Sequence, residues 1–146
     1  MSNIEKVLEE KGICVTTTKG DSMNPMLVEG RDKVVVVTPE FPLKKYDVPV
    51  YRKMGHYTMH RIVKVTKKGY IICGDNRGIL EKNVKESDII GVLNGFYQGD
   101  RYISCEDEEF IQYGKKAVRG LPLRLINNFF RRAIRKIKRT IKSKEL

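Results

Sequence analysis

The segment from Gly20 to Leu27 carries the residues best suited to nucleophilic chemistry. It reads GDSMNPML and places Ser22 in a glycine-flanked turn, with a proline three residues later. Such a turn can hold a serine hydroxyl exposed in one direction, and nearby backbone N–H groups can stabilise a developing oxyanion. A general base must lie within hydrogen-bond reach of the serine, and histidine suits that role near neutral pH. The chain has two histidines, His56 and His60.

The same segment resembles the nucleophile box of the signal-peptidase and LexA-like serine peptidases, whose pattern is roughly G-x-S-M-x-P-x-L. Further stretches resemble other boxes of that family in the same order: GRDKVVVVTP, LKKYDVPVY, HRIVKV, GYIICGDNR and SDIIGVL. The resemblance runs over residues 15–97. It implies an antiparallel β fold and a serine endopeptidase that cleaves a peptide or protein, for example a leader peptide.

The resemblance also implies a role for each candidate catalytic residue. Ser22 is the expected nucleophile, and His60 is the expected general base at a position where some members of the family carry a lysine and others a histidine. A histidine base works best when a carboxylate or carbonyl fixes its tautomer. Asp75, in the Gly-Asp-Asn box, is the expected orienting group, and Asp88 is the second choice.

Three neighbouring positions complete the expected site. Met23 and Pro25 are expected to shape the floor on which the substrate binds. Gly20 stands where signal peptidases commonly carry a hydroxyl residue that donates to the oxyanion. The backbone N–H of Ser22 is therefore the one donor that the sequence identifies, and we expect either a slow enzyme or a site that the substrate completes. A non-catalytic peptide-binding module on the same fold is the alternative.

Short β-prone segments must position these residues. Seven such segments, separated by turn residues, predict a mainly β, antiparallel domain: ICVTTT, KVVVVT, YDVPVY, YTMHRIVKV, YIICG, DIIGVLNGFY and RYIS. A short helix is expected before them over residues 3–10. Pro49 is expected on an edge strand or at a bulge. His56 is expected at the surface on a hairpin.

The charge distribution divides the chain in two. Residues 1–114 hold 17 Lys or Arg against 17 Asp or Glu, whereas residues 115–146 hold 12 Lys or Arg against one Glu. We therefore expect a neutral peptidase-like β domain over residues 1–114 and a basic tail over residues 115–146. Apolar residues recur in the tail at helical spacing, which predicts a basic amphipathic helix from about residue 122 to 142.

The tail leaves three uses open. It could contact an anionic membrane surface through residues 122–142, pack its apolar stripe on the β domain, or bind a nucleic acid or an acidic peptide. We favour the membrane. A nucleic-acid partner is the least expected, because no helix-turn-helix domain precedes the β segments. The oligomeric state is not defined by any pattern in the sequence.

The sequence also bears on location and cofactors. It has no run of about 18 apolar residues that could span a bilayer, and its N-terminus lacks the apolar stretch of a secretory signal. Cys14, Cys73 and Cys105 are widely spaced and complete no metal pattern, so we expect free thiols in a reducing compartment. The prediction is a cytoplasmic protein, peripheral at the inner membrane face, with no metal and no cofactor.

Overall fold

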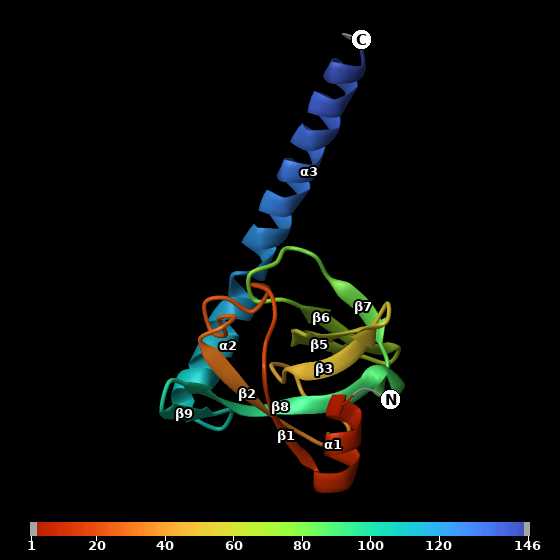
Figure 1. The fold of residues 1–146 in the computed structure, drawn as a ribbon. Helices are drawn as coiled ribbons and strands as arrows, with labels where there is room; N and C mark the ends of the chain where they lie inside the picture. Colours follow the sequence, from red (N-terminus) through yellow and green to blue (C-terminus); the bar gives the residue numbers. More distant parts are fainter. Residues whose placement is uncertain (1–2, 145–146) are drawn as a thin grey trace.

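The structure, a computed structural model, describes residues 3–144. Figure 1 shows a β body from which one long helix projects. The elements in chain order are α1 (Asn3–Lys11), β1 (Ile13–Thr17), β2 (Asp32–Val37), β3 (Pro49–Lys53), β4 (His56–Met59), β5 (Arg61–Thr66), β6 (Gly69–Cys73), β7 (Glu81–Val84), the 3₁₀ turn η1 (Glu86–Asp88), β8 (Ile89–Gln98), β9 (Arg101–Ser104), α2 (Glu108–Arg119) and α3 (Leu121–Lys144).

The strands form two antiparallel sheets. Six strands make the larger sheet in the order β1-β2-β8-β3-β4, with β9 paired to β8 beside this path. The smaller sheet has the order β5-β6-β7. The ten-residue strand β8 alternates buried with less buried residues over its first half and pairs with β2, β3 and β9, so it is the central strand of the larger sheet. As a result, β1 and β4 each leave one edge of the same sheet unpaired, as β9 does on its side away from β8.

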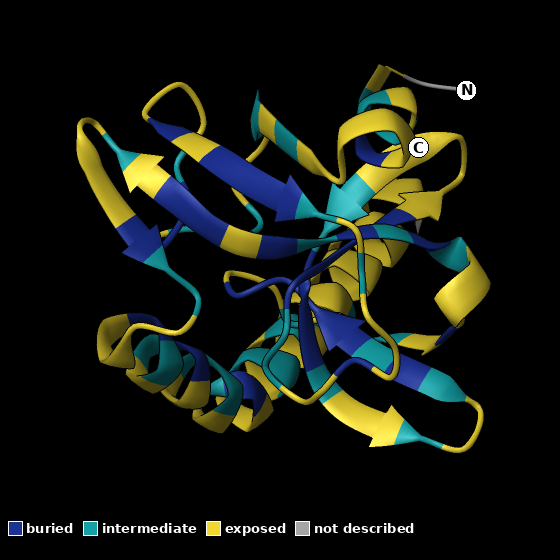
Figure 2. Ribbon diagram, turned by 90° about the horizontal axis from the view of Figure 1, so that it is seen from below, coloured by how far each residue is buried: buried dark blue, intermediate teal, exposed yellow. Residues whose placement is uncertain are grey.

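Two apolar cores hold the body together, and Figure 2 shows buried residues concentrated along the strands. The larger core joins α1, the segment after β1, the strands β2, β3, β8 and β9, and α2. Its buried members are Leu8, Met23, Met26, Leu27, Val34, Val36, Val48, Val50, Leu93, Phe96, Ile103 and Phe110. A second core lies between β3 and the smaller sheet and includes Tyr51, Ile62 and Ile72.

The fold agrees with the sequence in its antiparallel sheets, its short N-terminal helix and its long C-terminal helix, but the label "mainly β" is too strong. Strands and helices occupy similar shares of the chain, 35% and 33%. The difference comes from α2, which the sequence did not predict. The expected division between residues 114 and 115 falls inside this helix, because Gly114 lies in its middle and does not end it.

Candidate active site

Ser22 lies in the turn that joins β1 to β2, and buried neighbours fix this turn. The side chains of Met23, Met26 and Leu27 are buried in the larger core. The backbone N–H of Leu27 donates to Met23 O at 3.0 Å, which closes the turn. Ser22 itself is only half-buried. The apolar residues that follow the serine therefore anchor it in a turn that is only partly buried.

His60 lies at the junction between β4 and β5, not within one strand as expected. The segment YTMHRIVKV divides here, with β4 in the larger sheet and β5 in the smaller one. The imidazole is largely buried, and its Nδ1 lies 2.8 Å from Glu81 Oε1 and 3.0 Å from the Tyr51 hydroxyl. Glu81 comes from β7, which the sequence did not predict.

Glu81 is ionised at neutral pH and determines the tautomer of His60. Burial opposes ionisation, but hydrogen bonds from His60, Lys53 and Tyr51 outweigh it and lower the pKa of Glu81 from 4.5 to about 2. Tyr51 keeps its proton, because burial and the charge of Glu81 raise the pKa of its hydroxyl far above the ordinary value. A carboxylate only accepts hydrogen bonds, so His60 Nδ1 must donate to it. The other ring nitrogen, Nε2, is then free to accept a proton.

Gly74 brings the turn of Ser22 and the ring of His60 together. A methyl group on Gly74 would lie 2.8 Å from the Ser22 carbonyl oxygen and 3.2 Å from His60 Cδ2. The same loop bonds to the serine, since Asn76 N donates to Ser22 O at 2.9 Å. Both candidate catalytic residues therefore border one glycine that has no room for a side chain.

Ser22 Oγ makes no hydrogen bond within residues 3–144, either to His60 or to any other group. Catalytic hydrogen bonds are commonly long in unliganded sites and tighten when substrate binds. The arrangement is therefore a serine and a carboxylate-oriented histidine on either side of a glycine, with the direct contact between the two residues not made.

Asp75 is not the group that orients His60. Both of its carboxylate oxygens accept hydrogen bonds from Arg61, each at 2.8 Å, and the pair is almost completely buried. The expectation was wrong because the strongest donor near Asp75 is this guanidinium, which matches a carboxylate with two parallel N–H groups. The second choice, Asp88, lies in η1 and accepts from Lys85 N. Glu81 occupies the position beside the imidazole instead.

Arg61 connects the site to the C-terminal helices. Its guanidinium is fully buried and also donates to Tyr46 O at 3.1 Å. It lies 5.1 Å from the ring centroid of Phe110 and 5.6 Å from that of Tyr113, both in α2. The Arg61 and Asp75 pair therefore ties α2, β5 and the Gly-Asp-Asn loop into one unit behind His60.

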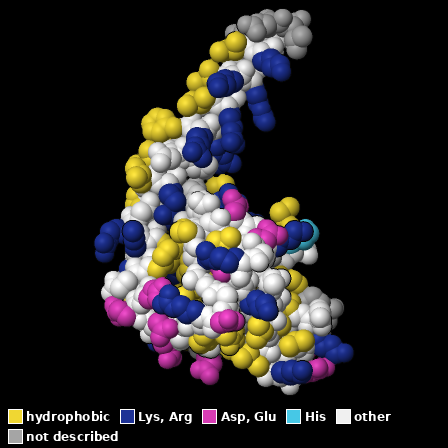
Figure 3. All heavy atoms as spheres, turned by 60° about the vertical axis from the view of Figure 1, so that its left-hand side comes forward, with side chains coloured by type: hydrophobic (Ala, Val, Ile, Leu, Met, Phe, Trp, Pro, Cys, Tyr) yellow, Lys and Arg dark blue, Asp and Glu magenta, His cyan; other side chains and the backbone are white. Residues whose placement is uncertain are grey.

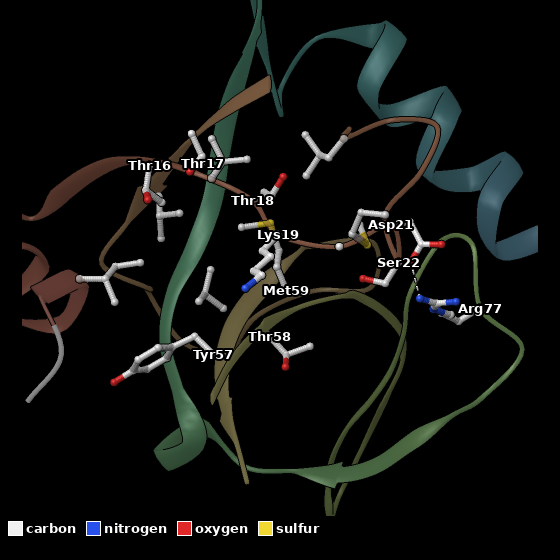
Figure 4. A pocket seen from close by; sticks show the side chains of 17 residues that line it. Thr16, Thr17, Thr18, Lys19, Asp21, Ser22, Tyr57, Thr58, Met59 and Arg77 are labelled. Atoms are coloured by element: carbon white, nitrogen blue, oxygen red, sulfur yellow. Dashed lines mark hydrogen bonds and ion pairs between the residues drawn. The ribbon is translucent and has the colours of Figure 1, made fainter. Parts of the chain in front are cut away.

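A groove of about 520 Å³ leads away from Ser22 between β1 and β4. The Ser22 and Lys19 side chains point into it, with Thr58 and Met59 on the opposite side (Figure 4). Its apolar floor consists of Met23, Leu27, Val34, Val36 and Val50, all buried in the larger core. Because β1 and β4 are the free edges of one sheet, their unpaired backbone groups flank the groove on both sides.

The remaining expected residues, Met23, Pro25 and His56, lie in three different surroundings. Met23 lies in the groove floor, but Pro25 does not line the groove; it borders a separate hollow against α2, together with Met26 and Phe110. His56 is exposed at the start of β4. It is not part of the pair formed by the His60 imidazole and the Glu81 carboxylate.

The oxyanion donors are few, as the sequence indicated. The Gly20 N–H is already used, because it donates to Glu29 Oε2 at 2.7 Å. Among the described residues, the backbone N–H of Ser22 has no protein acceptor and remains available. The Thr18 hydroxyl, in the groove wall, is buried without a partner. When Ser22 Oγ attacks a carbonyl carbon, the oxyanion that forms would thus have at least one free backbone N–H group beside the nucleophile.

In comparison with known proteins, the chain matches no protein-family model, no curated protein and no solved structure. Among residues 3–144, no group of His, Cys, Asp and Glu side chains could hold a metal ion. No helix in this part of the chain has both the length and the apolar composition needed to cross a membrane.

Proposed function

We propose that this chain is a serine endopeptidase with Ser22 as nucleophile, His60 as general base and Glu81 as the residue that orients His60. The observation that carries the proposal is the Nδ1 contact between His60 and an ionised Glu81, because it leaves Nε2 able to accept a proton. The ordered resemblance to the signal-peptidase and LexA-like boxes supports the same assignment of Ser22 and His60. Membership of the signal-peptidase and LexA-like fold family is part of the same proposal.

The reaction follows from these roles. Ser22 Oγ attacks the carbonyl carbon of the scissile bond while its proton passes to His60 Nε2, and the backbone N–H of Ser22 stabilises the oxyanion. Collapse of this intermediate breaks the C–N bond, and the imidazolium returns the proton to the leaving amine. Water, deprotonated by His60, then hydrolyses the acyl-enzyme and frees Ser22.

The groove favours an extended polypeptide as substrate. A strand lying between β1 and β4 can form main-chain hydrogen bonds with both edges, and this is the usual basis of strand addition. The aliphatic floor favours small or medium apolar side chains where they point down. Lys19 places a positive charge in the wall, and no acidic side chain among the described residues pairs with it.

A serine-reactive probe tests the assignment of the nucleophile. A fluorophosphonate should label the wild type and fail to label Ser22→Ala, whereas Ser87→Ala, which changes an exposed serine in η1, should be labelled normally. A peptide library incubated with the wild type should gain new N-termini that are absent with Ser22→Ala. Undiminished labelling of Ser22→Ala would remove Ser22 from the mechanism.

A peptide-binding module without catalysis is the second candidate. The observation that favours it is the absence of a hydrogen bond between Ser22 Oγ and His60 in the described part of the chain. On this alternative the library peptides bind in the groove and are recovered uncut. The Met59→Lys change in the groove wall should then weaken binding while no product forms with either protein.

A cytoplasmic location is part of the proposal. Cys14, Cys73 and Cys105 are all free thiols; Cys73 is buried and the other two are partly buried. Free thiols of this kind are typical of a reducing compartment. Attachment at the inner face of the membrane depends on α3, which is considered next.

A further inference from the structure

The helix α3 is mostly unpartnered. Its contacts with the β body lie in its first two turns, where Arg124 Nε donates to Arg77 O and Asn128 Nδ2 donates to Gly78 O. The described side-chain hydrogen bonds beyond Asn128 stay within the helix. With 24 residues, α3 extends for about 36 Å and leaves the body behind, as Figure 1 shows. The tail therefore does not pack its apolar side on the β domain in this structure.

One side of α3 is apolar and open to solvent. Six large side chains form this apolar stripe, and each is between 51 and 69% exposed: Ile126, Phe129, Phe130, Ile134, Ile137 and Ile141. The sequence of α3 contains nine Lys or Arg and no Asp or Glu. Figure 3 shows the hydrophobic side chains along one edge of the helix and the Lys and Arg side chains away from that edge.

We infer that α3 docks on an anionic lipid surface, with the apolar stripe inserted among the headgroups. An interfacial helix needs an apolar face, a Lys- and Arg-rich polar face and low overall hydrophobicity. The helix α3 meets each requirement. Lys and Arg stems beside the stripe can reach outward to lipid phosphates while the stripe stays in the hydrocarbon boundary.

Other occupants satisfy only part of this surface. A nucleic acid would neutralise the cations but leave six large apolar side chains in water. A second copy of the chain could cover the stripe, but two helices that carry only positive charge would then lie side by side. Lipid with anionic headgroups satisfies both faces at once, and each cation near such a surface adds to the attraction.

The base of α3 lies next to the proposed active site. Arg77, whose carbonyl accepts from Arg124, pairs through its guanidinium with Asp21, and its neighbour Asn76 bonds to Ser22 O. Docking of α3 would therefore hold the Ser22 end of the groove near the lipid surface. Lipid binding itself does not depend on catalysis, so Ser22→Ala should bind lipid as the wild type does.

Vesicle sedimentation of the full chain tests the inference. Vesicles of phosphatidylcholine with about 30% phosphatidylglycerol should bind the protein about tenfold or more tightly than pure phosphatidylcholine, and added salt should weaken the binding. Ile137→Glu should lower the affinity about tenfold or more, because it places an acid in the stripe. Val65→Glu makes a similar change at an exposed position of β5 and should have no effect.

A reporter in the stripe gives a second readout. The chain contains no tryptophan, so Phe130→Trp supplies one fluorophore whose emission should shift to shorter wavelength when it enters lipid. Circular dichroism of each variant verifies that the body is folded. The inference is overturned if the two vesicles bind equally, if Ile137→Glu binds as the wild type does, if duplex DNA binds more tightly than the anionic vesicles, or if the stripe instead drives dimer formation.

Discussion

Replacing Glu81 by Gln is the sharpest test of the proposed mechanism. The change keeps the size of the side chain but removes the charge that faces His60 Nδ1. Three donors converge on this carboxylate: His60, Lys53 and Tyr51. A glutamine offers a single accepting oxygen to all three, and its NH₂ group can turn towards the imidazole. A donor at Nδ1 selects the tautomer that carries its proton on Nε2, which cannot accept a proton from Ser22.

The size of the effect follows from the contacts of Glu81. Its pKa falls from 4.5 to about 2 in a side chain that is 15% exposed. At about 1.4 kcal/mol per pKa unit, this corresponds to roughly 3 kcal/mol in favour of the ionised form. His60 provides the largest of the three favourable contacts, so on the order of 1–2 kcal/mol holds the imidazolium, which is a factor of about 5–30 in rate. Loss of the correct tautomer adds to this, and we expect kcat to fall about 10²–10⁴-fold.

The assay separates this role from a structural one. The Michaelis constant should change little, because Glu81 does not line the groove. Glu86→Gln is the matched control, since Glu86 also accepts from a tyrosine, Tyr70, but does not touch His60. A fall in kcat of less than about threefold for Glu81→Gln, or an effect confined to the Michaelis constant, would refute the reasoning.

Acid titration checks the same carboxylate without any substrate. The pKa of Glu81 is lower in the folded chain than in the unfolded one, so its stabilising contribution is complete above about pH 4.5 and disappears as the pH falls towards 2. The free energy of unfolding of the wild type should therefore drop by up to roughly 3 kcal/mol more than that of Glu81→Gln over this window. Parallel pH dependences in urea denaturation would contradict the assigned contacts.

Three further changes probe the surroundings of the site. Gly74→Ala should lower kcat about 10²-fold, because the added methyl group pushes the Ser22 backbone and the His60 ring apart. Gly120→Ala is the control and should leave kcat unchanged, because its methyl group meets only the flexible tip of an arginine and, at longer distance, the helix backbone. Arg61→Met leaves Asp75 buried without a partner and should cost about 3–5 kcal/mol in urea denaturation, part of which the added Asp75→Asn change should restore; no restoration would show that the two are not coupled. Burial raises the pKa of Cys105 to about 12, so iodoacetamide at about pH 8 should leave this thiol unmodified until urea unfolds the chain, as mass spectrometry would show.

Local sequence was enough to predict the turn of Ser22 and the two terminal helical segments. The turn depends on residues that are adjacent in the chain, with apolar anchors directly after the serine. The helix α3 carries apolar residues at helical spacing over six turns, and this periodicity needs no tertiary context. Its first residue, Leu121, lies within one position of the expected start at Pro122.

The partner of His60 could not be predicted in this way. Glu81 is 21 residues away in the sequence and belongs to EKNV, a short polar segment with little β propensity. It becomes a strand only because β6 supplies an edge to pair with, and the register that sets Ile72 opposite Glu81 carries the carboxylate towards His60. Asp75 was the better choice by motif, but a motif does not say that Arg61 will occupy both of its oxygens.

The helix α2 was missed for a related reason. Gly114, in its middle, predicts a helix end when only local propensity is considered. In the structure, a methyl group at Gly114 would lie 2.8 Å from Arg61 Nη1, so the glycine makes room for the buried guanidinium. For Pro49 the sequence left an edge strand or a bulge open, and the structure has the second: Pro49 begins β3, a central strand, next to a bulge at Val50 and Tyr51.

The position of β1 and β4 at opposite ends of one sheet has a consequence for how the protein pairs with other chains. A strand lying between them would act as the missing stave of a barrel, so that the occupied sheet has no open edge between these two strands. Each of these two strands has a row of unsatisfied backbone groups, which can pair with any extended chain, including a second copy. Capture of an extended substrate and pairing with a second copy would therefore use the same edges, so a tightly held peptide should block pairing with a second copy.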